Sequence, residues 1–208
     1  MVQNQKTGGE MSLEDLKKKY PWPSEKPSVP ARYSNGNTPE GWCHGNNVKM
    51  FETLVNEKTK VIVDAGSWLG LSAWHFLRLA PNATIICLDT WQGSAEHRKN
   101  ELLPILYETF LVNMWEYRDR IIPMRSGGLI GFNEICTQEI EPDLVYIDMA
   151  HDKESVICDI NMARLSFHTA TICGDDYTWQ GVKDALEHLS AKEKLKFETY
   201  TTCWKLTQ

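Results

Sequence analysis

The sequence predicts an α/β protein built on a mostly parallel sheet with helices on both faces. Apolar runs of strand length alternate with longer amphipathic stretches, which is typical of consecutive β-α-β units. The first such run, in VIVDAGSWLGLS at residues 61–72, continues into a turn with two glycines and then into an amphipathic stretch. At the C-terminus two strand-like segments follow each other without a helix between them, so we expect an antiparallel pair there.

Composition is that of one globular domain. The chain has 208 residues, of which 42% are hydrophobic and 24% charged, and its net charge is −6. No basic stripe suits a phosphate backbone, so nucleic acid is not the expected partner. No apolar run approaches the length of a membrane span or a signal peptide, and the six cysteines are scattered without a CxxC pair. We therefore expect no membrane anchor, no zinc or disulfide framework, and a cytoplasmic location.

Residues 1–40 form a separate, polar segment. Its stretch PWPSEKPSVPARYSNGNTPEG is rich in Pro, Ser, Gly and Asn, which do not suit a helix or a central strand. Two interpretations stay open: a disordered leader, or an arm that folds over a site with Trp22, Tyr33 and Trp42. We predict a flexible or lid-like arm over 1–40 and a folded domain over 41–208.

The first half of the domain alternates helices and strands. Val48, Phe51 and Leu54 at helical spacing predict a helix over 46–56. After the strand at 61–64, a helix over 69–80 is ended by Pro81-Asn82. TIICLD at 84–89 predicts a second buried strand. Residues 100–118 predict one helix, or two broken near Pro104, and 121–124 a third strand.

The second half continues the alternation. Residues 128–140 predict a helix and DLVYID at 143–148 a fourth strand. Val156 and Ile160 lie on one face of a helix over 151–165, and residues 169–175 form the fifth strand. Val182, Leu186 and Leu189 predict an amphipathic helix over 179–189. The closing pair occupies 197–202 and 203–207.

Carboxylates stand at the ends of four predicted strands. Asp64 ends the first, Asp89 the second, Asp148 the fourth, and Asp175-Asp176 the fifth. Ligands of parallel sheets bind at this carboxyl edge. Gathering carboxylates there destabilises the fold unless a cation compensates, so we expect a ligand site.

The turn after the first strand suits a nucleotide-like ligand. Gly66 and Gly70 allow close approach of the backbone, and the helix that follows points its N-terminus at the turn. The spacing Asp-x-Gly-x-x-x-Gly differs from the dinucleotide motif, which disfavours a nicotinamide dehydrogenase. Asp89 lies 25 residues after Asp64. At this place in such folds an acidic residue accepts hydrogen bonds from the ribose hydroxyls.

The second acidic group suits a metal ion. Asp148, Asp175 and Asp176 offer hard oxygen ligands for Mg²⁺, or for Mn²⁺ or Ca²⁺. His151 stands three residues beyond Asp148. Beside a metal it is a candidate general base, because its ordinary pKa lies near working pH.

Four stretches in this order carry a family resemblance: VIVDAGSWLGLS, CLDTWQGS, DLVYIDMAHDKES and ICGDDYTWQGVKDAL. Together they resemble class I S-adenosylmethionine-dependent methyltransferases from about Gly41 to the C-terminus. The last two look like the small divalent-metal-dependent O-methyltransferases of the catechol, macrolide-sugar and cephalosporin types. The resemblance implies a Rossmann-like three-layer sandwich, with a seven-stranded, mostly parallel sheet and a C-terminal antiparallel hairpin.

The resemblance also implies site roles. Those for S-adenosylmethionine fall on Asp64, Gly66, Ser67, Gly70, Asp89, Thr90, Trp91, Ser126, Gly127 and Asp148. The metal ligands are Asp148, Asp175 and Asp176, and the base is His151. Met149 departs from the usual glycine, and Phe167-His168 from a usual Gly-Gly. These departures concern loop shape, and hence the substrate, more than the chemistry.

The predicted reaction is transfer of the methyl of S-adenosylmethionine to a hydroxyl of a small molecule or sugar, with a bound divalent metal such as Mg²⁺. Trp91, Trp179 and the Trp22–Trp42 arm are candidate walls of the acceptor site, and the arm offers a surface for a homo-oligomer. Two alternatives stay open. One is a metal-independent methyltransferase acting on nitrogen or a carboxylate, and the other is a cofactor-binding module without catalysis.

Overall fold

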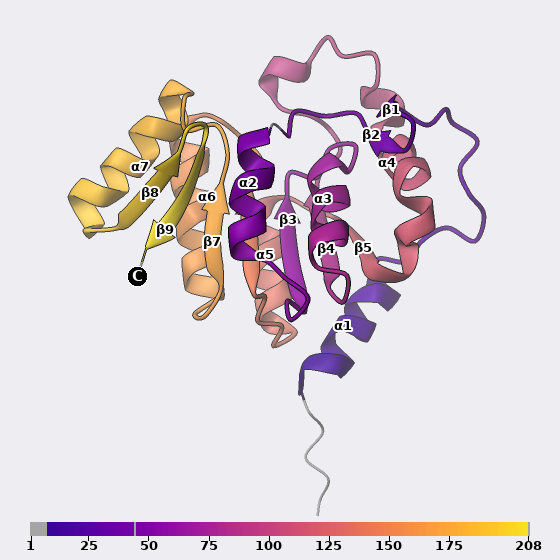
Figure 1. Ribbon diagram of the computed structural model, residues 1–208, viewed down its shortest axis with the longest axis horizontal. Helices are drawn as coiled ribbons and strands as arrows, with labels where there is room; N and C mark the ends of the chain where they lie inside the picture. The colour runs from indigo at the N-terminus through magenta and orange to yellow at the C-terminus, as the bar shows by residue number, and fades with distance from the viewer. Residues whose placement is uncertain (1–7, 44, 208) are drawn as a thin grey trace, which may run out of the picture.

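A seven-stranded sheet forms the middle of the molecule (Figure 1). The computed structural model describes residues 8–43 and 45–207. Within them the strand order is β5-β4-β3-β6-β7-β9-β8, with β9 antiparallel to both of its neighbours. The strands are β3 (Val61–Ala65), β4 (Thr84–Asp89), β5 (Ile121–Arg125), β6 (Leu144–Ile147), β7 (Thr171–Gly174), β8 (Lys196–Tyr200) and β9 (Cys203–Thr207). The predicted fold class is confirmed.

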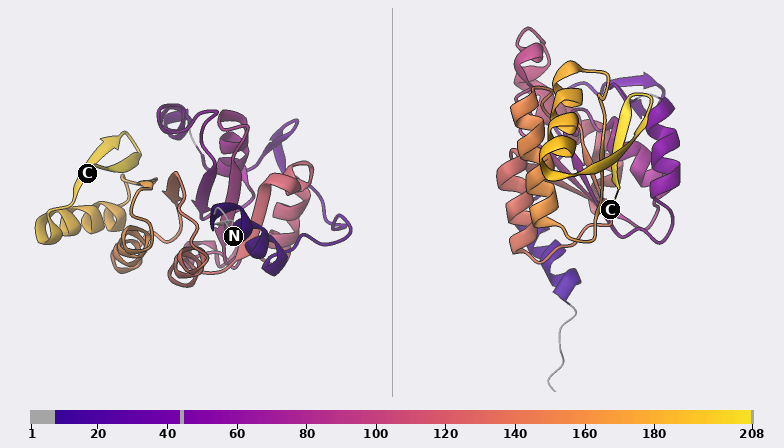
Figure 2. Two further views of the ribbon diagram at one scale, coloured as in Figure 1. Left: turned by 90° about the horizontal axis from the view of Figure 1, so that it is seen from below. Right: turned by 90° about the vertical axis from the view of Figure 1, so that its left-hand side faces the viewer.

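Helices cover both faces of this sheet, which makes three layers (Figure 2). One face carries α2 (Gly45–Leu54), α3 (Leu71–Leu79) and α4 (Leu106–Met114). The other carries α5 (Gly128–Thr137), α6 (Lys153–Ser166) and α7 (Gln180–Glu193). Short 3₁₀ helices are η1 (Ala95–His97), η2 (Leu103–Ile105) and η3 (Trp115–Arg120). No helix in the described residues is long and apolar enough to cross a membrane.

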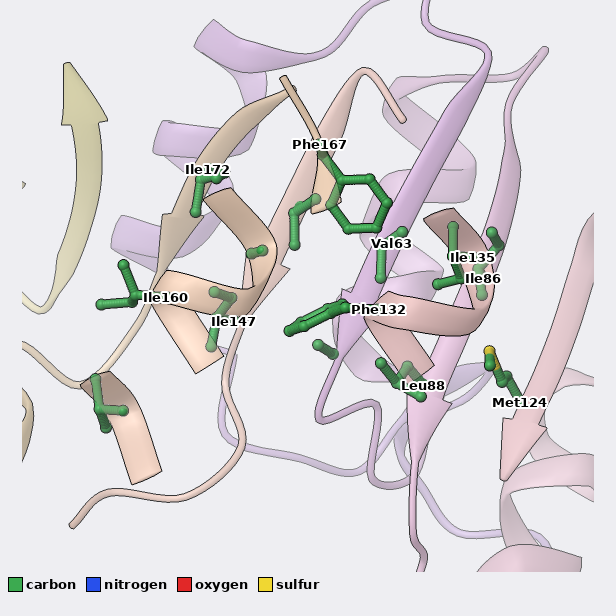
Figure 3. Close-up of a cluster of buried hydrophobic side chains, with 14 of the residues drawn as sticks. Val63, Ile86, Leu88, Met124, Phe132, Ile135, Ile147, Ile160, Phe167 and Ile172 are labelled. Atoms are coloured by element: carbon green, nitrogen blue, oxygen red, sulfur yellow. The ribbon is translucent and has the colours of Figure 1, made fainter. Parts of the chain in front are cut away.

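The core follows from the alternation of side chains along buried strands. In β3, Val61 and Val63 face the layer of α5 and α6, whereas Ile62 faces that of α2 and α3. Figure 3 shows the first of these clusters, in which the fully buried Phe132 of α5 lies over the sheet. Burying one such ring contributes roughly 1.5–3 kcal/mol. Both faces of the central strands are therefore fixed by packing.

The N-terminal segment contains elements that the sequence analysis does not expect: α1 (Gly8–Lys19), β1 (Tyr33–Asn35) and β2 (Thr38–Pro39). Leu16 of α1 is buried in the core cluster of α5. Trp22 Nε1 donates to the carbonyl of Ile121 at 2.9 Å. The stretch 21–41, which is expected to build no helix and no central strand, contains neither: β1 and β2 form a separate two-stranded sheet. The unexpected helix α1 lies before this stretch, where a few apolar contacts anchor an otherwise polar helix. Residues 1–7 lie outside the described part, and the boundary at residue 40 stays a prediction.

Most predicted elements are present with ends that differ by at most four residues, and β4 and β9 match their predicted ranges. The stretch 100–118 contains η2, α4 and most of η3, and Pro104 lies in η2, directly before α4. At α6 the shift has a consequence. Asp152 is the N-cap, and its Oδ1 accepts from the backbone of Ser155 at 3.0 Å. His151 therefore lies in the loop before the helix rather than in its first turn.

Candidate functional site

A cavity of about 900 Å³ opens at the carboxyl edge of the parallel strands. In Figure 1 this is the upper edge, above which the segment between β4 and α4 rises. The cavity brings together nine of the predicted site residues: Gly66, Asp89, Thr90, Ser126, Gly127, Asp148, His151, Asp175 and Asp176. A smaller hollow of about 670 Å³, beside β7, β8 and β9, contains none of them.

The turn after β3 positions the first half of the cavity. Gly66 has φ +96°, and a Cβ there would lie 1.7 Å from the carbonyl oxygen of Asp148. Only glycine fits this close approach of two strand ends. Trp68, which follows at φ +48°, donates its backbone N–H to Asp89 Oδ2 at 2.8 Å.

Asp89 is held rigidly at the end of β4. Its Oδ1 accepts the backbone N–H of Trp91 at 2.7 Å, in addition to the bond from Trp68. Burial raises the pKa of this carboxyl above its ordinary value, and the backbone N–H groups partly oppose the shift. A fixed carboxylate that lines the cavity is suited to accept hydrogen bonds from the hydroxyl groups of a ligand.

Asp64 does not reach the cavity. It is fully buried towards α3, where its Oδ2 accepts from Ser72 Oγ at 2.9 Å and its Oδ1 has no hydrogen-bond partner. Burial raises its pKa to about 7, against the opposing hydrogen bonds of Ser72 and Ser67. Ser67 is itself buried and donates to the Asp64 carbonyl at 2.7 Å. Both residues support the turn from its buried side. Their predicted contacts with a cofactor stay predictions.

Gly70 and Trp91 also lie outside the cavity lining. Gly70 precedes α3 with φ +94°, and a Cβ there would lie 2.6 Å from the sulfur of Met114. The Trp91 ring is buried against Tyr107 and Phe110, with ring centres 4.8 Å apart in each case. Trp91 is therefore a core residue whose backbone N–H serves Asp89, and its predicted contact with a cofactor stays a prediction.

An acidic and histidine cluster occupies the other half of the cavity. Asp148, His151 and Asp176 offer ligand atoms that all lie within 4.8 Å of one another. His151 Nε2 lies 2.8 Å from Asp176 Oδ2, in an ion-pair geometry that does not fit a hydrogen bond, and 3.9 Å from Asp148 Oδ1. Its Nδ1 donates to Glu96 Oε1 at 2.6 Å. One imidazole thus stands among three carboxylates.

The titration of this cluster follows from its charges. Partial burial alone would lower the pKa of His151, but the carboxylates of Asp148, Asp176 and Glu96 outweigh burial and raise it to about 10. Burial raises the pKa of Asp148 to about 6; the bond to His151 opposes this shift, while Asp175 and Asp176 add to it. At neutral pH the imidazole is protonated in the absence of another cation.

Asp175 stands slightly apart from the cluster. It is 5% exposed, and its Oδ1 lies 3.5 Å from the thiol of Cys203, which donates to it. In the described residues the three-membered cluster contains His151 where the sequence analysis has Asp175. The assignment of Asp148, Asp175 and Asp176 as metal ligands stays a prediction.

Aromatic rings form the mouth of the cavity. Trp42 packs on Trp68 and on His97, with ring centres 5.4 and 5.5 Å apart. Trp179 lies against His151 at 4.5 Å. Of the predicted tryptophan walls, Trp42 and Trp179 line the cavity. Trp91 is buried in the core, and Trp22 lies at the start of β5, on the opposite edge of the sheet.

Three acidic or histidine residues of the cavity are not among those predicted from the sequence. Glu96 and His97 come from η1, and Asp159 comes from the middle of α6. Burial raises the pKa of Asp159 to about 7. No spacing in the sequence links these residues to the strand ends, because their positions depend on how a loop and a helix fold back over the edge.

Comparisons with known proteins agree on the fold. Neither protein-family models nor curated proteins give a match. CalS11, a TDP-rhamnose 3'-O-methyltransferase of calicheamicin biosynthesis, aligns with a TM-score of 0.54 and 14% identity over 76% of each chain. An O-methyltransferase candidate from Klebsiella pneumoniae aligns at 0.54 and 17% over 99% of this chain and 90% of its own. Fibrillarin from Aeropyrum pernix, with natively bound S-adenosylmethionine, aligns at 0.52 and 15% over 74% and 67%.

The chain has the class I methyltransferase fold. This confirms, at the level of the fold, the resemblance that the sequence motifs carry. At identities of 14–17% the likeness does not transfer a reaction. The function has to be inferred from the residues in the cavity.

Proposed function

We propose that the protein transfers the methyl group of S-adenosylmethionine to a hydroxyl of a small molecule or sugar. The observation that carries the proposal is the content of one cavity. A rigid carboxylate suited to ribose, Asp89, shares it with the cluster of Asp148, His151 and Asp176. The cofactor half and the chemical half of such an enzyme are thus adjacent, and the fold is that of methyltransferases.

The cofactor half fits a nucleoside with a positive sulfonium. Asp89 would accept the ribose hydroxyls, and Ser126 and Gly127 line the cavity where the adenine would lie. Gly66 lines the cavity at its close approach to the backbone of Asp148, where the methionine part would lie. The carboxylates of the cavity favour the positive charge of the donor. The chief contribution of the protein would be in-line positioning of the methyl group and the acceptor oxygen, roughly 3 Å apart.

The acidic and histidine cluster fits a divalent metal. Its donors are two carboxylates and an imidazole within 4.8 Å of one another, and Asp175 adds a third carboxylate to the same cavity. We propose Asp148, Asp175 and Asp176 as the ligands, a set of oxygen donors that suits Mg²⁺. A cation bound there would lower the pKa of the acceptor hydroxyl.

His151 would take the proton of the acceptor hydroxyl. With its pKa raised to about 10 by three carboxylates, it already holds a proton at neutral pH and cannot accept another. Neutralisation of Asp148 and Asp176 returns this pKa towards its ordinary value, because their charges cause the rise. The base would therefore be competent only in the metal-loaded protein.

The same contacts favour a second candidate, metal-independent methyl transfer. The His151 imidazolium already lies 2.8 Å from Asp176 and 2.6 Å from Glu96. It compensates part of the carboxylate charge without a metal. In that case His151 would orient the acceptor as a hydrogen-bond donor, and the carboxylate of Asp148, whose pKa is about 6, would take the proton that the acceptor loses. Positioning would supply the rest of the rate.

Methyl transfer to a panel of vicinal diols, followed with and without EDTA, tests the proposal. We expect transfer that EDTA abolishes and Mg²⁺ restores, and a loss of at least a hundredfold in rate for Asp176→Asn. Asp119→Asn, at an exposed position of η3, is the matched control and should keep the wild-type rate. Transfer that is insensitive to EDTA and to Asp176→Asn would favour the metal-independent candidate. No transfer to any acceptor, with cofactor binding intact, would favour a binding module.

A further inference from the structure

Exposed apolar side chains gather at the mouth of the cavity. In the described residues, five large hydrophobic side chains are 48% or more exposed: Trp42, Leu129, Ile130, Leu165 and Trp179. Four of the five line this one cavity, and Leu165 alone does not. Trp42 precedes α2, Leu129 and Ile130 belong to the first turn of α5, and Trp179 precedes α7. Separate segments of the chain thus place exposed apolar surface around one opening, which indicates a ligand with an apolar body.

Acidic side chains outnumber basic ones in the lining of the cavity. Six carboxylates line it: Asp89, Glu96, Asp148, Asp159, Asp175 and Asp176. In the described residues of the lining there is no lysine or arginine, and the basic side chains are His97 and His151 alone. A phosphate or carboxylate on the ligand would meet no lysine or arginine, the residues that usually bind such groups. The His151 imidazole already lies 2.8 Å from Asp176 and 2.6 Å from Glu96.

This imbalance does not depend on the state of the metal cluster. A divalent cation would offset the charge of Asp148, Asp175 and Asp176, and the ribose would occupy Asp89. Glu96 would still face the cavity as a carboxylate, and Asp159, with its pKa raised to about 7 by burial, would be partly ionised. Like charges in a partly buried site repel an anion over several ångströms.

We infer that the acceptor is an uncharged or cationic hydroxyl compound with an apolar, ring-containing body. We also infer that the cavity excludes anionic conjugates. Both inferences rest on the proposed function. The rim of Trp42, Leu129, Ile130 and Trp179 would hold the body, and the carboxylates would reject phosphate, coenzyme A and carboxylate groups. Specificity would thus arise from repulsion as much as from contact.

Four probes that share one ring test the inference: ethylcatechol, dopamine, dihydroxyphenylacetate and the phosphate ester of the corresponding alcohol. Their dissociation constants are measured by calorimetry on the full chain loaded with S-adenosylhomocysteine and Mg²⁺. We expect ethylcatechol and dopamine to bind at least tenfold more tightly than the two anions. Equal or tighter binding of the anions, or no binding of any probe, would overturn the inference.

Charge placed on the rim sharpens the test. Ile130→Lys should tighten binding of the two anionic probes at least threefold and weaken that of dopamine. Leu165→Lys is the matched control, since Leu165 is equally exposed but lies outside the cavity, and should change no probe. If both variants act alike, the rim does not select the acceptor.

The outcome for the cofactor separates this inference from the proposed function. Binding of S-adenosylhomocysteine is measured first and without acceptor. Its absence would refute the proposed function and with it the inference. Its presence, together with a preference for anionic probes, would refute the inference and leave methyl transfer standing.

Discussion

Replacement of Asp64 by asparagine is expected to remove a pH-dependent loss of stability. The carboxyl is fully buried, one of its oxygens has no hydrogen-bond partner, and its pKa is about 7. Because the pKa of an acid is raised in the folded state, ionisation is harder in the fold than in the unfolded chain. The free energy of unfolding should therefore decrease as pH rises from near 4 to about 7, and then level off.

The magnitude follows from the two pKa values. With about 7 in the fold and 3.8 as the ordinary value, linkage gives a loss of about 2.5 kcal/mol between pH 5 and pH 8. The Asp64→Asn variant would carry no charge at this position and would lack this loss. Its amide group would lie where Oδ1 of Asp64 has no partner, a constant cost of about 1–3 kcal/mol at every pH.

Urea unfolding at a series of pH values between 5 and 8 measures the effect. The difference in unfolding free energy between wild type and Asp64→Asn should change by about 2.5 kcal/mol across this range, in favour of the variant at high pH. Asp119→Asn, exposed on η3, should follow the wild type throughout. If the unfolding free energies of wild type and Asp64→Asn changed with pH in parallel, the claim that the fold raises the pKa of Asp64 would be refuted.

Three further predictions follow from individual contacts. Gly66→Ala should cost more than about 3 kcal/mol or prevent folding, because its Cβ would overlap a carbonyl oxygen; Gly45→Ala, where a Cβ meets nothing within 4 Å, should be near neutral in thermal unfolding. Glu96→Gln should lower the pKa of His151 by about 1–2 units in the metal-free protein, measured by NMR titration, because it removes one of the carboxylates that raise it. Trp22→Ala should cost about 1–3 kcal/mol in stability through its lost ring packing and hydrogen bond, yet leave the affinity for S-adenosylhomocysteine unchanged.

The parallel core could be predicted because its signals are local. Runs such as TIICLD are apolar, short and closed by an acidic residue, and a strand buried on both faces requires this composition. The topology of parallel strands then sends Asp89, Asp148 and Asp175 to one edge, where the structure has them. The signal for the closing hairpin is equally local, since β8 and β9 follow each other with no room for a helix.

Other features depend on contacts between distant parts of the chain. Asp64 is expected to end its strand, but the strand continues to Ala65. The side chain of Asp64 therefore faces α3 instead of the cavity. The helix α1 is polar for most of its length and is anchored to the core by the buried side chain of Leu16. Glu96 meets His151 across 55 positions of sequence. Spacing along the chain carries no signal for such pairs, since tertiary packing decides them.

The affinity for S-adenosylhomocysteine tests the central claim most directly. Calorimetric titration of the wild type should show one binding site per chain. Asp89→Asn should bind at least tenfold more weakly, since it loses charge-assisted hydrogen bonds to the ribose, each worth about 1.5–3 kcal/mol. No binding by the wild type, or equal affinity in the two proteins, would contradict a S-adenosylmethionine site at this edge of the sheet.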